Sequence, residues 1–270
     1  MTFEQILVRA ERSIATVTLN RPDRLNAWTP RMSQELRTCF RTLADDHEIR
    51  VIILTGAGRG FCAGADIEAL QAIDSDSGGS SGKPAPFDPG APKGFQGAHT
   101  WFPTVPQPII AAINGPAAGL GLVLALWCDL RFAAEEAVFS SAFSRRGLVA
   151  EHGISWLLPR LVGISRAQDI LLSARRISGT EAAQLGMVNA AFKADDLLPS
   201  VNSYASMLAT QVSPRSTRIM KRQLWEALGG GLDEALAIAD REMEKSFSSE
   251  DFKEGVACFA EKREPRFTGR

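Results

Sequence analysis

The chain has 270 residues, and its 30 lysines and arginines almost balance 31 aspartates and glutamates, for a net charge of −1. Hydrophobic residues at 45% and charged residues at 23% are ordinary values for a globular protein with a substantial core. The balanced charge argues against a nucleic-acid partner, and the scattered cysteines and histidines argue against a metal site.

No stretch of the chain predicts a membrane anchor. The longest apolar run, 116–128, holds about 13 residues, which is too short to span a bilayer. The N-terminus lacks a basic segment followed by an apolar one, so we expect no secretion signal. The sequence therefore predicts a cytoplasmic protein without membrane insertion.

The first half of the chain alternates strand-like and helix-like segments. Thr29 followed by Pro30 predicts a helix start, and the run 120–127 predicts a helix that is apolar on all sides and hence buried. Six short apolar runs are predicted to be strands: 6–8, 14–19, 51–54, 108–113, 130–133 and 137–139. Strands that alternate with helices predict an α/β fold with a largely parallel sheet joined by crossovers.

The composition changes between residues 73 and 97. Serine and glycine fill 75–82, and four prolines follow before residue 93. Such a segment predicts a long flexible loop. It closely follows a glycine-rich turn, so one interpretation is that it borders a binding pocket; the other is a tolerated surface insertion.

Helices are predicted to dominate from residue 154 onward. The three glycines at 229–231 separate two of them. The predicted helices are 154–162, 165–173, 180–186, 195–210, 214–228, 232–245 and 249–260. We therefore expect a core over 1–195 and a C-terminal helical segment over 196–270.

Two glycine-rich turns each follow an apolar run and precede a predicted helix. The first, 56–66, reads GAGRGFCAGAD, and the second, 114–121, reads NGPAAGLG. Turns with few side chains let another molecule approach the backbone, and the helix start beyond each leaves unpaired N–H groups. Two such turns can direct two backbone donors at one oxygen, which is how an oxyanion hole is built.

The pairing of FCAGAD with NGPAAGLG about fifty residues later resembles the crotonase family, the enoyl-CoA hydratases and isomerases. Further segments carry the resemblance along nearly the whole chain: NRP at 20–22, LNA at 25–27, WLLPRLVG at 156–163 and FAEKR at 259–263. The resemblance implies a ββα spiral core with a C-terminal helical trimerisation segment, assembled as a homotrimer or a dimer of trimers. It implies a CoA thioester substrate and no separate cofactor, since coenzyme A is part of the substrate.

The resemblance also assigns the chemistry. It implies that the backbone N–H groups of Ala65 and Leu120 hold the thioester oxygen. Ordinary hydratases of the family use two glutamates, but the corresponding positions here are Val123 and Phe143, which cannot ionise. Some branches, including dienoyl-CoA isomerases, carry an aspartate at the position of Glu151, which implies a single acid/base there. The residue pattern alone also allows Glu151 to serve as a helix cap.

The resemblance implies two further groups of site residues. The acyl pocket is expected to hold Val123, Phe143, His152 and Trp156, and the apolar members are expected to raise the pKa of Glu151. His152 has either a tuning or substrate-binding role or a structural one. The predicted CoA-binding residues are Arg24, Leu25, Ala27, Ala63, Asp66 and Ile67, with Phe259 and Lys262 from a neighbouring subunit. Lys262 is also compatible with a solvated surface lysine.

The function predicted from these residues is hydration or double-bond isomerisation of an enoyl-CoA, with proton transfer through Glu151 alone. The alternative is an acyl-CoA-binding homologue without catalysis, which the apolar residues at positions 123 and 143 motivate. RNA binding, known in one branch of the family, is disfavoured because no basic helix is present.

Overall fold

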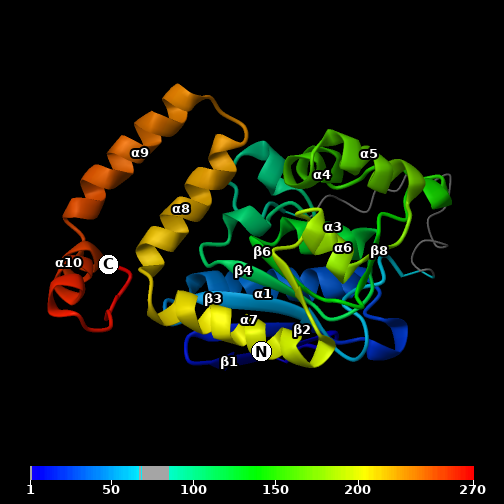
Figure 1. Cartoon of the computed structure of the whole chain (residues 1–270), viewed down its shortest axis with the longest axis horizontal. Helices are drawn as coiled ribbons and strands as arrows, with labels where there is room; N and C mark the ends of the chain where they lie inside the picture. Colours follow the sequence, from blue (N-terminus) through cyan, green and yellow to red (C-terminus); the bar gives the residue numbers. More distant parts are fainter. Residues whose placement is uncertain (1, 67, 69–84) are drawn as a thin grey trace.

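The computed structural model describes residues 2–66, 68 and 85–270. Within these residues the main sheet has six strands in the order β1-β2-β3-β4-β6-β9 (Figure 1). β1 runs antiparallel to β2, and every other neighbouring pair is parallel. The strands are β1 (Ile6–Glu11), β2 (Ile14–Leu19), β3 (Val51–Gly56), β4 (Ile109–Ile113), β6 (Leu130–Ala134) and β9 (Ala190–Phe192).

A second, smaller sheet has the order β5-β7-β8. β7 (Val138–Ser140) runs parallel to β5 (Ala117–Ala118) and antiparallel to β8 (Ile177–Ser178). The prediction of an α/β fold is thus confirmed, but the prediction of one largely parallel sheet is incomplete, because the last predicted strand, 137–139, belongs to this second sheet. Both sheets are mixed.

The helices begin and end close to the predicted positions. Thr29 caps the first one, because its side chain accepts a hydrogen bond from the amide of Met32 and Pro30 follows at the first helical position. The α-helices are α1 (Pro30–Asp45), α3 (Leu120–Trp127), α4 (Ile154–Val162), α5 (Ile164–Ser173), α6 (Gly179–Gln184), α7 (Ala194–Thr210), α8 (Pro214–Ala227), α9 (Leu232–Phe247) and α10 (Glu250–Glu261). The short 3-10 helices are η1 (Pro22–Arg24), η2 (Lys93–Gln96), η3 (Phe102–Thr104) and η4 (Ser144–Arg146).

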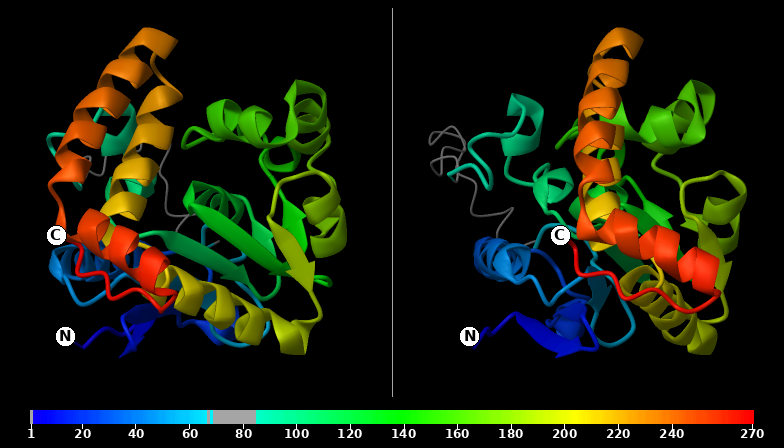
Figure 2. Two further views of the ribbon diagram at one scale, coloured as in Figure 1. Left: turned by 60° about the vertical axis from the view of Figure 1, so that its left-hand side comes forward. Right: turned by 90° about the vertical axis from the view of Figure 1, so that its left-hand side faces the viewer.

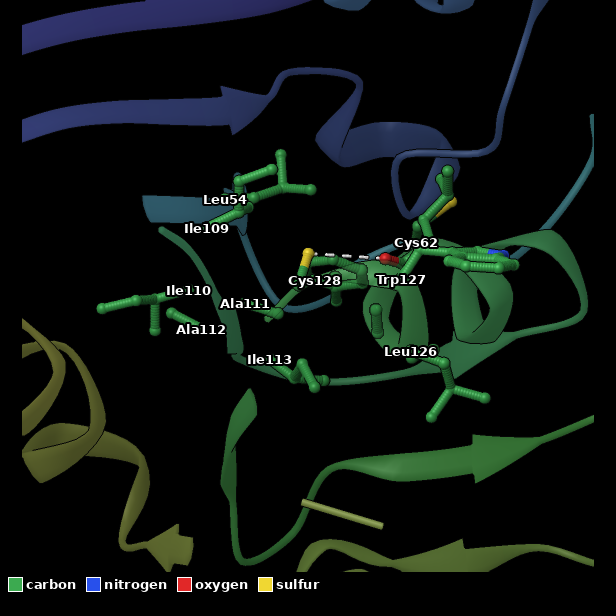
Figure 3. Close-up of a cluster of buried hydrophobic side chains, with 14 of the residues drawn as sticks. Leu54, Cys62, Ile109, Ile110, Ala111, Ala112, Ile113, Leu126, Trp127 and Cys128 are labelled. Atoms are coloured by element: carbon green, nitrogen blue, oxygen red, sulfur yellow. Dashed lines mark hydrogen bonds between the residues drawn. The ribbon is translucent and has the colours of Figure 1, made fainter. Parts of the chain in front are cut away.

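The core lies around β4 and α3. All residues of β4 and of α3 are buried, as the uniformly apolar sequence of α3 predicts. Figure 3 shows Trp127 and Cys128 at the end of α3, and Ile109–Ile113 along β4 beside Leu54 of β3. This packing fixes α3, and with it the second glycine-rich turn, relative to the main sheet.

The C-terminal helices extend beyond the sheets. The division between 1–195 and 196–270 stays a prediction: it falls within α7, which packs on β2, β3, β4, β6 and β9. Figure 2 shows α8 and α9 side by side, reaching past the sheets, with α10 following them. None of the helices in the described part of the chain is long and apolar enough to cross a membrane.

Candidate active site

The two glycine-rich turns pack directly on each other. Residues 62 and 117 form a parallel β-bridge, and the amide of Ala118 donates to the carbonyl of Cys62 at 3.0 Å. A Cβ atom on Gly121 would lie 2.0 Å from that same carbonyl oxygen, so only glycine fits there. A Cβ atom on Gly64, whose φ is +100°, would lie 2.8 Å from the carbonyl oxygen of Ala118. The glycines therefore permit a contact between two backbone segments that side chains would separate.

This contact brings Leu120 close to Gly64, the residue before Ala65. Trp28 pairs with Ala65 in a parallel bridge, in which the neighbours Gly64 and Asp66 make the hydrogen bonds to Trp28. Leu120 is the first residue of α3, so its N–H has no partner within the helix. Neither amide donates to another group in the described residues. The amide nitrogen of Leu120 is 3.8 Å from the Cβ position of Gly64, so one unused donor lies next to the residue that precedes the other in the chain.

The segment before α1 lies along the first turn. Buried Asn26, at a φ of +56°, donates to the carbonyls of Ala57 and Gly60 at 3.0 and 2.8 Å. The amide of Ala63 donates to the carbonyl of Leu25 at 3.0 Å. Leu25, Ala27 and Ala63, which were predicted to bind CoA, are therefore brought together beside the turn.

Two charged residues predicted to bind CoA have partners within the protein. Asp66 is buried and pairs with Arg21 at 2.8 Å, and this hydrogen bond lowers the pKa of its carboxyl. Arg24 is exposed and pairs with Glu68 at 3.0 Å. Asp66 thus holds the end of the first turn, whereas Arg24 lies on the surface. Ile67 is outside the described residues.

Glu151 and His152 form a pair just before α4. The Nε2 atom of His152 lies 3.2 Å from a carboxylate oxygen of Glu151, whose side chain is 38% exposed. α4 has no side-chain cap, so the carboxylate of Glu151 does not serve as one. His152 has a φ of +54°, an uncommon conformation for a residue with a side chain, of a kind that clusters at functional sites. Burial lowers the pKa of the His152 imidazole, and the Glu151 carboxylate opposes that effect.

His99, which the sequence did not single out, connects this pair to the first turn. Its ring meets that of His152 edge-on at 4.6 Å between centroids, and it meets Trp28 edge-on at 5.5 Å. Trp28 in turn is bridged to Ala65. Burial, with smaller contributions from the charges of His152 and Arg37, lowers the pKa of His99 to about 3. His99 is therefore neutral at physiological pH, and its ring lies between Trp28, next to the first turn, and His152, next to Glu151.

An apolar pocket of roughly 380 Å³ lies beside the Glu151–His152 pair. Gly153, the next residue, is part of its wall, together with Trp156, Trp127 and Trp225. Of the four residues predicted for the acyl pocket, Trp156 lines this cavity. Val123 has no exposed surface and Phe143 is 7% exposed, so both lie in the core.

The remaining predicted residues lie far along the chain. Phe259 is 87% exposed on α10, and Lys262 follows the end of that helix. α10, which carries Phe259, contacts α9 and lies away from α3 (Figure 1). Trp225 of α8 lines the pocket of its own chain, a contribution that the sequence did not indicate. Among residues 2–66, 68 and 85–270, no cluster of three metal-binding side chains is present.

Comparison with known proteins identifies the family. The sequence model of the enoyl-CoA hydratase/isomerase family matches residues 9–270. The chain is 35% identical to 1,2-epoxyphenylacetyl-CoA isomerase of Escherichia coli over 99% of this chain and 100% of the relative. It is 34% identical to probable enoyl-CoA hydratase echA8 of Mycobacterium tuberculosis, with both chains fully covered.

Solved structures agree with the sequence relatives. Enoyl-CoA hydratase from Bacillus anthracis superposes with a TM-score of 0.87 at 29% identity, covering 99% of this chain and 100% of the other. Enoyl-CoA hydratase from Mycobacterium tuberculosis superposes with a TM-score of 0.86 at 30% identity, covering 98% and 99%. The two mixed sheets and the C-terminal helices are thus those of the crotonase fold, and the chain belongs to the enoyl-CoA hydratase/isomerase family.

Proposed function

We propose that this chain catalyses hydration or double-bond isomerisation of an enoyl-CoA, with Glu151 as its only acid/base. The observation that carries the proposal is the grouping of two unused amides, on Ala65 and Leu120, with a carboxylate reached through Trp28 and His99. Relatives at similar identity are named as an isomerase and as probable hydratases, which supports both reactions equally.

The amides of Ala65 and Leu120 would bind the thioester oxygen. In both reactions negative charge develops on that oxygen as an enolate forms. Two fixed N–H donors stabilise this charge, and removing one donor of such a pair typically raises the barrier by about 3–4 kcal/mol. Because the donors are backbone groups, the leucine side chain at position 120 does not interfere with them.

Glu151 would move the proton. In isomerisation, its carboxylate removes a proton from a carbon next to the double-bond system. The resulting carboxyl group exchanges its proton with solvent and then delivers a proton to another carbon of the same enolate. In hydration, it accepts a proton from the water that attacks Cβ, and the proton is then delivered to Cα. One carboxyl group that alternates between base and acid suffices for either reaction.

His152 would orient Glu151. Nε2 of His152 lies 3.2 Å from a carboxylate oxygen of Glu151. A neutral imidazole with its proton on Nε2 would donate to that oxygen, which can only accept. The lowered pKa of His152 keeps the ring neutral near pH 7. A neutral donor fixes one carboxylate oxygen without adding the positive charge that would make Glu151 a weaker base.

We also propose that the active form is a homotrimer or a dimer of trimers. The C-terminal helices expose apolar side chains that a single chain leaves uncovered: Leu224, Leu232, Leu236, Met243, Phe247, Phe252, Val256 and Phe259, each at least 43% exposed. Large apolar side chains exposed in such number on consecutive helices favour an interaction site there. In such an assembly Phe259 and Lys262 would close over the CoA of a neighbouring subunit.

A catalytically inactive acyl-CoA-binding protein is the second candidate. It is favoured by Val123 and Phe143, which leave the positions of the two hydratase glutamates buried and apolar. This candidate predicts binding of CoA esters with no change in any of them.

The test is a panel of enoyl- and dienoyl-CoA esters incubated in heavy water and analysed by mass spectrometry. Hydration adds the mass of D₂O, isomerisation places deuterium on carbon without adding oxygen, and an inactive protein changes nothing. Glu151→Gln should lower turnover by about 10²- to 10⁴-fold while the ester still binds. Full activity of this variant on the substrate that the panel identifies would refute the proposal.

A further inference from the structure

Four aromatic side chains from separate parts of the chain form the wall of the pocket beside Glu151. Phe95 comes from η2, Trp127 ends α3, Trp156 lies on α4 and Trp225 lies on α8. The ring planes of Trp127 and Trp156 are within 11° of each other with centroids 6.3 Å apart, and those of Trp127 and Trp225 are within 29° at 5.6 Å. Phe95 meets Trp127 and Trp225 edge-on, at 6.2 and 6.0 Å. The four rings that line the pocket thus pack on one another.

The three indoles are held in place by polar contacts. Trp127 Nε1 donates to the carbonyl of His152 at 3.0 Å, and Trp225 Nε1 donates to a carboxylate oxygen of Asp129 at 3.0 Å. The guanidinium carbon of Arg160 lies 4.1 Å from the ring centroid of Trp156. These contacts fix the three indole rings. A rigid wall loses little conformational freedom when a ligand binds.

The pocket offers almost no polar partner to a ligand. Glu226 is the only ionisable residue in its described wall, and its side chain is 33% exposed and 4.0 Å from Arg222. The part of the acyl group that enters this cavity is therefore uncharged. The wall also includes Gly153, so a group bound in the pocket lies close to the Glu151–His152 pair.

A flat aromatic group fits this wall better than an aliphatic one. Aromatic pairs gain about 0.5–1.5 kcal/mol beyond the burial of their area when they stack offset or meet edge-to-face. A straight alkyl chain makes no such contacts and loses rotamer freedom on binding. A saturated ring is as compact as an aromatic one, but it is thicker and lacks the charge distribution of a π system.

Resting on the proposed acyl-CoA function, we propose that the aromatic pocket, formed by Phe95, Trp127, Trp156 and Trp225, selects acyl groups that end in an aromatic ring. In this arrangement the ring lies against the indoles and the thioester oxygen lies at the amides of Ala65 and Leu120. The reacting carbons are then between them, next to Glu151. The selectivity is a property of the pocket and does not depend on which reaction Glu151 carries out.

Three saturated-thioester probes with eight acyl carbons each test the proposal: phenylacetyl-CoA, cyclohexylacetyl-CoA and octanoyl-CoA. Their affinities for the full chain are measured by isothermal titration calorimetry. Phenylacetyl-CoA should bind about tenfold more tightly than either of the others. Equal affinity for octanoyl-CoA, or for cyclohexylacetyl-CoA, would overturn aromatic selection.

Substitutions in the aromatic pocket test whether the indoles cause the preference for phenylacetyl-CoA. Trp156→Leu and Trp225→Leu should each weaken phenylacetyl-CoA binding by about fivefold and change octanoyl-CoA binding by less than about twofold, whereas Trp156→Phe should recover most of the loss. Leu172→Ala, at a side chain on α5 that is 75% exposed, is the control and should change neither affinity. Circular dichroism confirms that each variant is folded. If a variant weakened the binding of all three probes by the same factor, the indoles would not distinguish aromatic from aliphatic acyl groups.

The two proposals fail separately. If phenylacetyl-CoA is selected but no ester gains deuterium in the presence of Glu151, the pocket assignment stands and the proposed catalysis falls. If Glu151-dependent deuterium incorporation is found but the three probes bind equally, the catalysis stands and aromatic selection falls.

Discussion

The indole nitrogen of Trp127 donates a 3.0 Å hydrogen bond to the main-chain carbonyl of His152 and so joins the aromatic pocket to the proposed proton-transfer pair. His152 and Gly153 both have positive φ angles, +54° and +78°. A Cβ on Gly153 would lie 2.9 Å from the Trp127 ring, so this turn and the indole are in close contact. The position of Glu151 therefore depends on a residue of the pocket wall.

Replacing Trp127 by phenylalanine tests this dependence. Trp127→Phe keeps an aromatic ring but leaves the carbonyl of His152 without its donor, a loss that costs about 1–3 kcal/mol when the group is buried. We expect kcat to fall by about tenfold with a smaller change in KM, because Glu151 would no longer be held in place. Trp225→Phe, which loses a hydrogen bond to Asp129 instead, is the matched control. If both variants lose the same fraction of kcat, the special role of the Trp127 contact is refuted.

The buried imidazole of His99 should make folding stability depend on pH. Its pKa of about 3 in the folded protein lies below the unfolded value of 6.5. Between these values the unfolded chain binds a proton that the folded chain excludes, so stability falls as pH drops from about 6.5 towards 3, by about 1.4 kcal/mol per pH unit. Chemical denaturation of the wild type and of His99→Phe measures this, since the variant should lack that part of the slope. Identical slopes in the two proteins would contradict the assignment.

The contact between the two glycine-rich turns should tolerate no side chain at Gly121. A methyl group there would lie 2.0 Å from the carbonyl oxygen of Cys62. Gly121→Ala must push the turns apart, so we expect a loss of stability of at least about 1–3 kcal/mol and turnover reduced by more than tenfold. Gly231→Ala is the control, because a Cβ at that position has no neighbour within 4 Å. The two melting temperatures and activities are compared, and a Gly121→Ala enzyme that matches the control would refute the close contact.

The ion pair of Lys221 with Asp129 anchors α8. The two charges are 2.6 Å apart, and the side chain of Lys221 is 6% exposed. Lys221 also donates to the carbonyl of Gln107 at 3.0 Å, and burial lowers its pKa. Lys221→Met should cost about 3–5 kcal/mol, because it leaves Asp129 without its counter-charge. Arg9→Ala, which removes an exposed pair with Glu11, should cost less than about 1 kcal/mol in the same denaturation experiment. Comparable losses in the two variants would show that the buried pair is not the anchor.

Several features of the fold could be predicted because they follow from local sequence. Thr29 with Pro30 marks the start of α1, and Ser213 with Pro214 marks the start of α8 in the same way. The uniformly apolar run of α3 predicts its burial. The glycine-rich turns were recognised because close backbone contact leaves few alternatives to glycine at positions such as Gly121.

Other features had no local signal. The strands β5 and β8 have two residues each, which is too short for an alternating pattern to appear. His99 lies in a loop whose sequence does not reveal that Trp28 and His152 flank it. Trp225 reaches the pocket through a partner 96 residues earlier, Asp129, and such long-range pairs are invisible to periodicity. The assignment of CoA contacts, the oligomeric state and the cytoplasmic location stay predictions.

The anchoring of α8 on Asp129 has a consequence for synthesis of the protein. Both turns, Glu151 and His152 leave the ribosome before Lys221 and Trp225, so a nascent chain can assemble its amide pair and carboxylate while one side of the aromatic pocket is still missing. In the proposed selection, the pocket is thus completed last, by a helix that Asp129 holds through both Lys221 and Trp225. Mutations along α8 can therefore retune which ring is accepted without rebuilding the machinery that moves the proton.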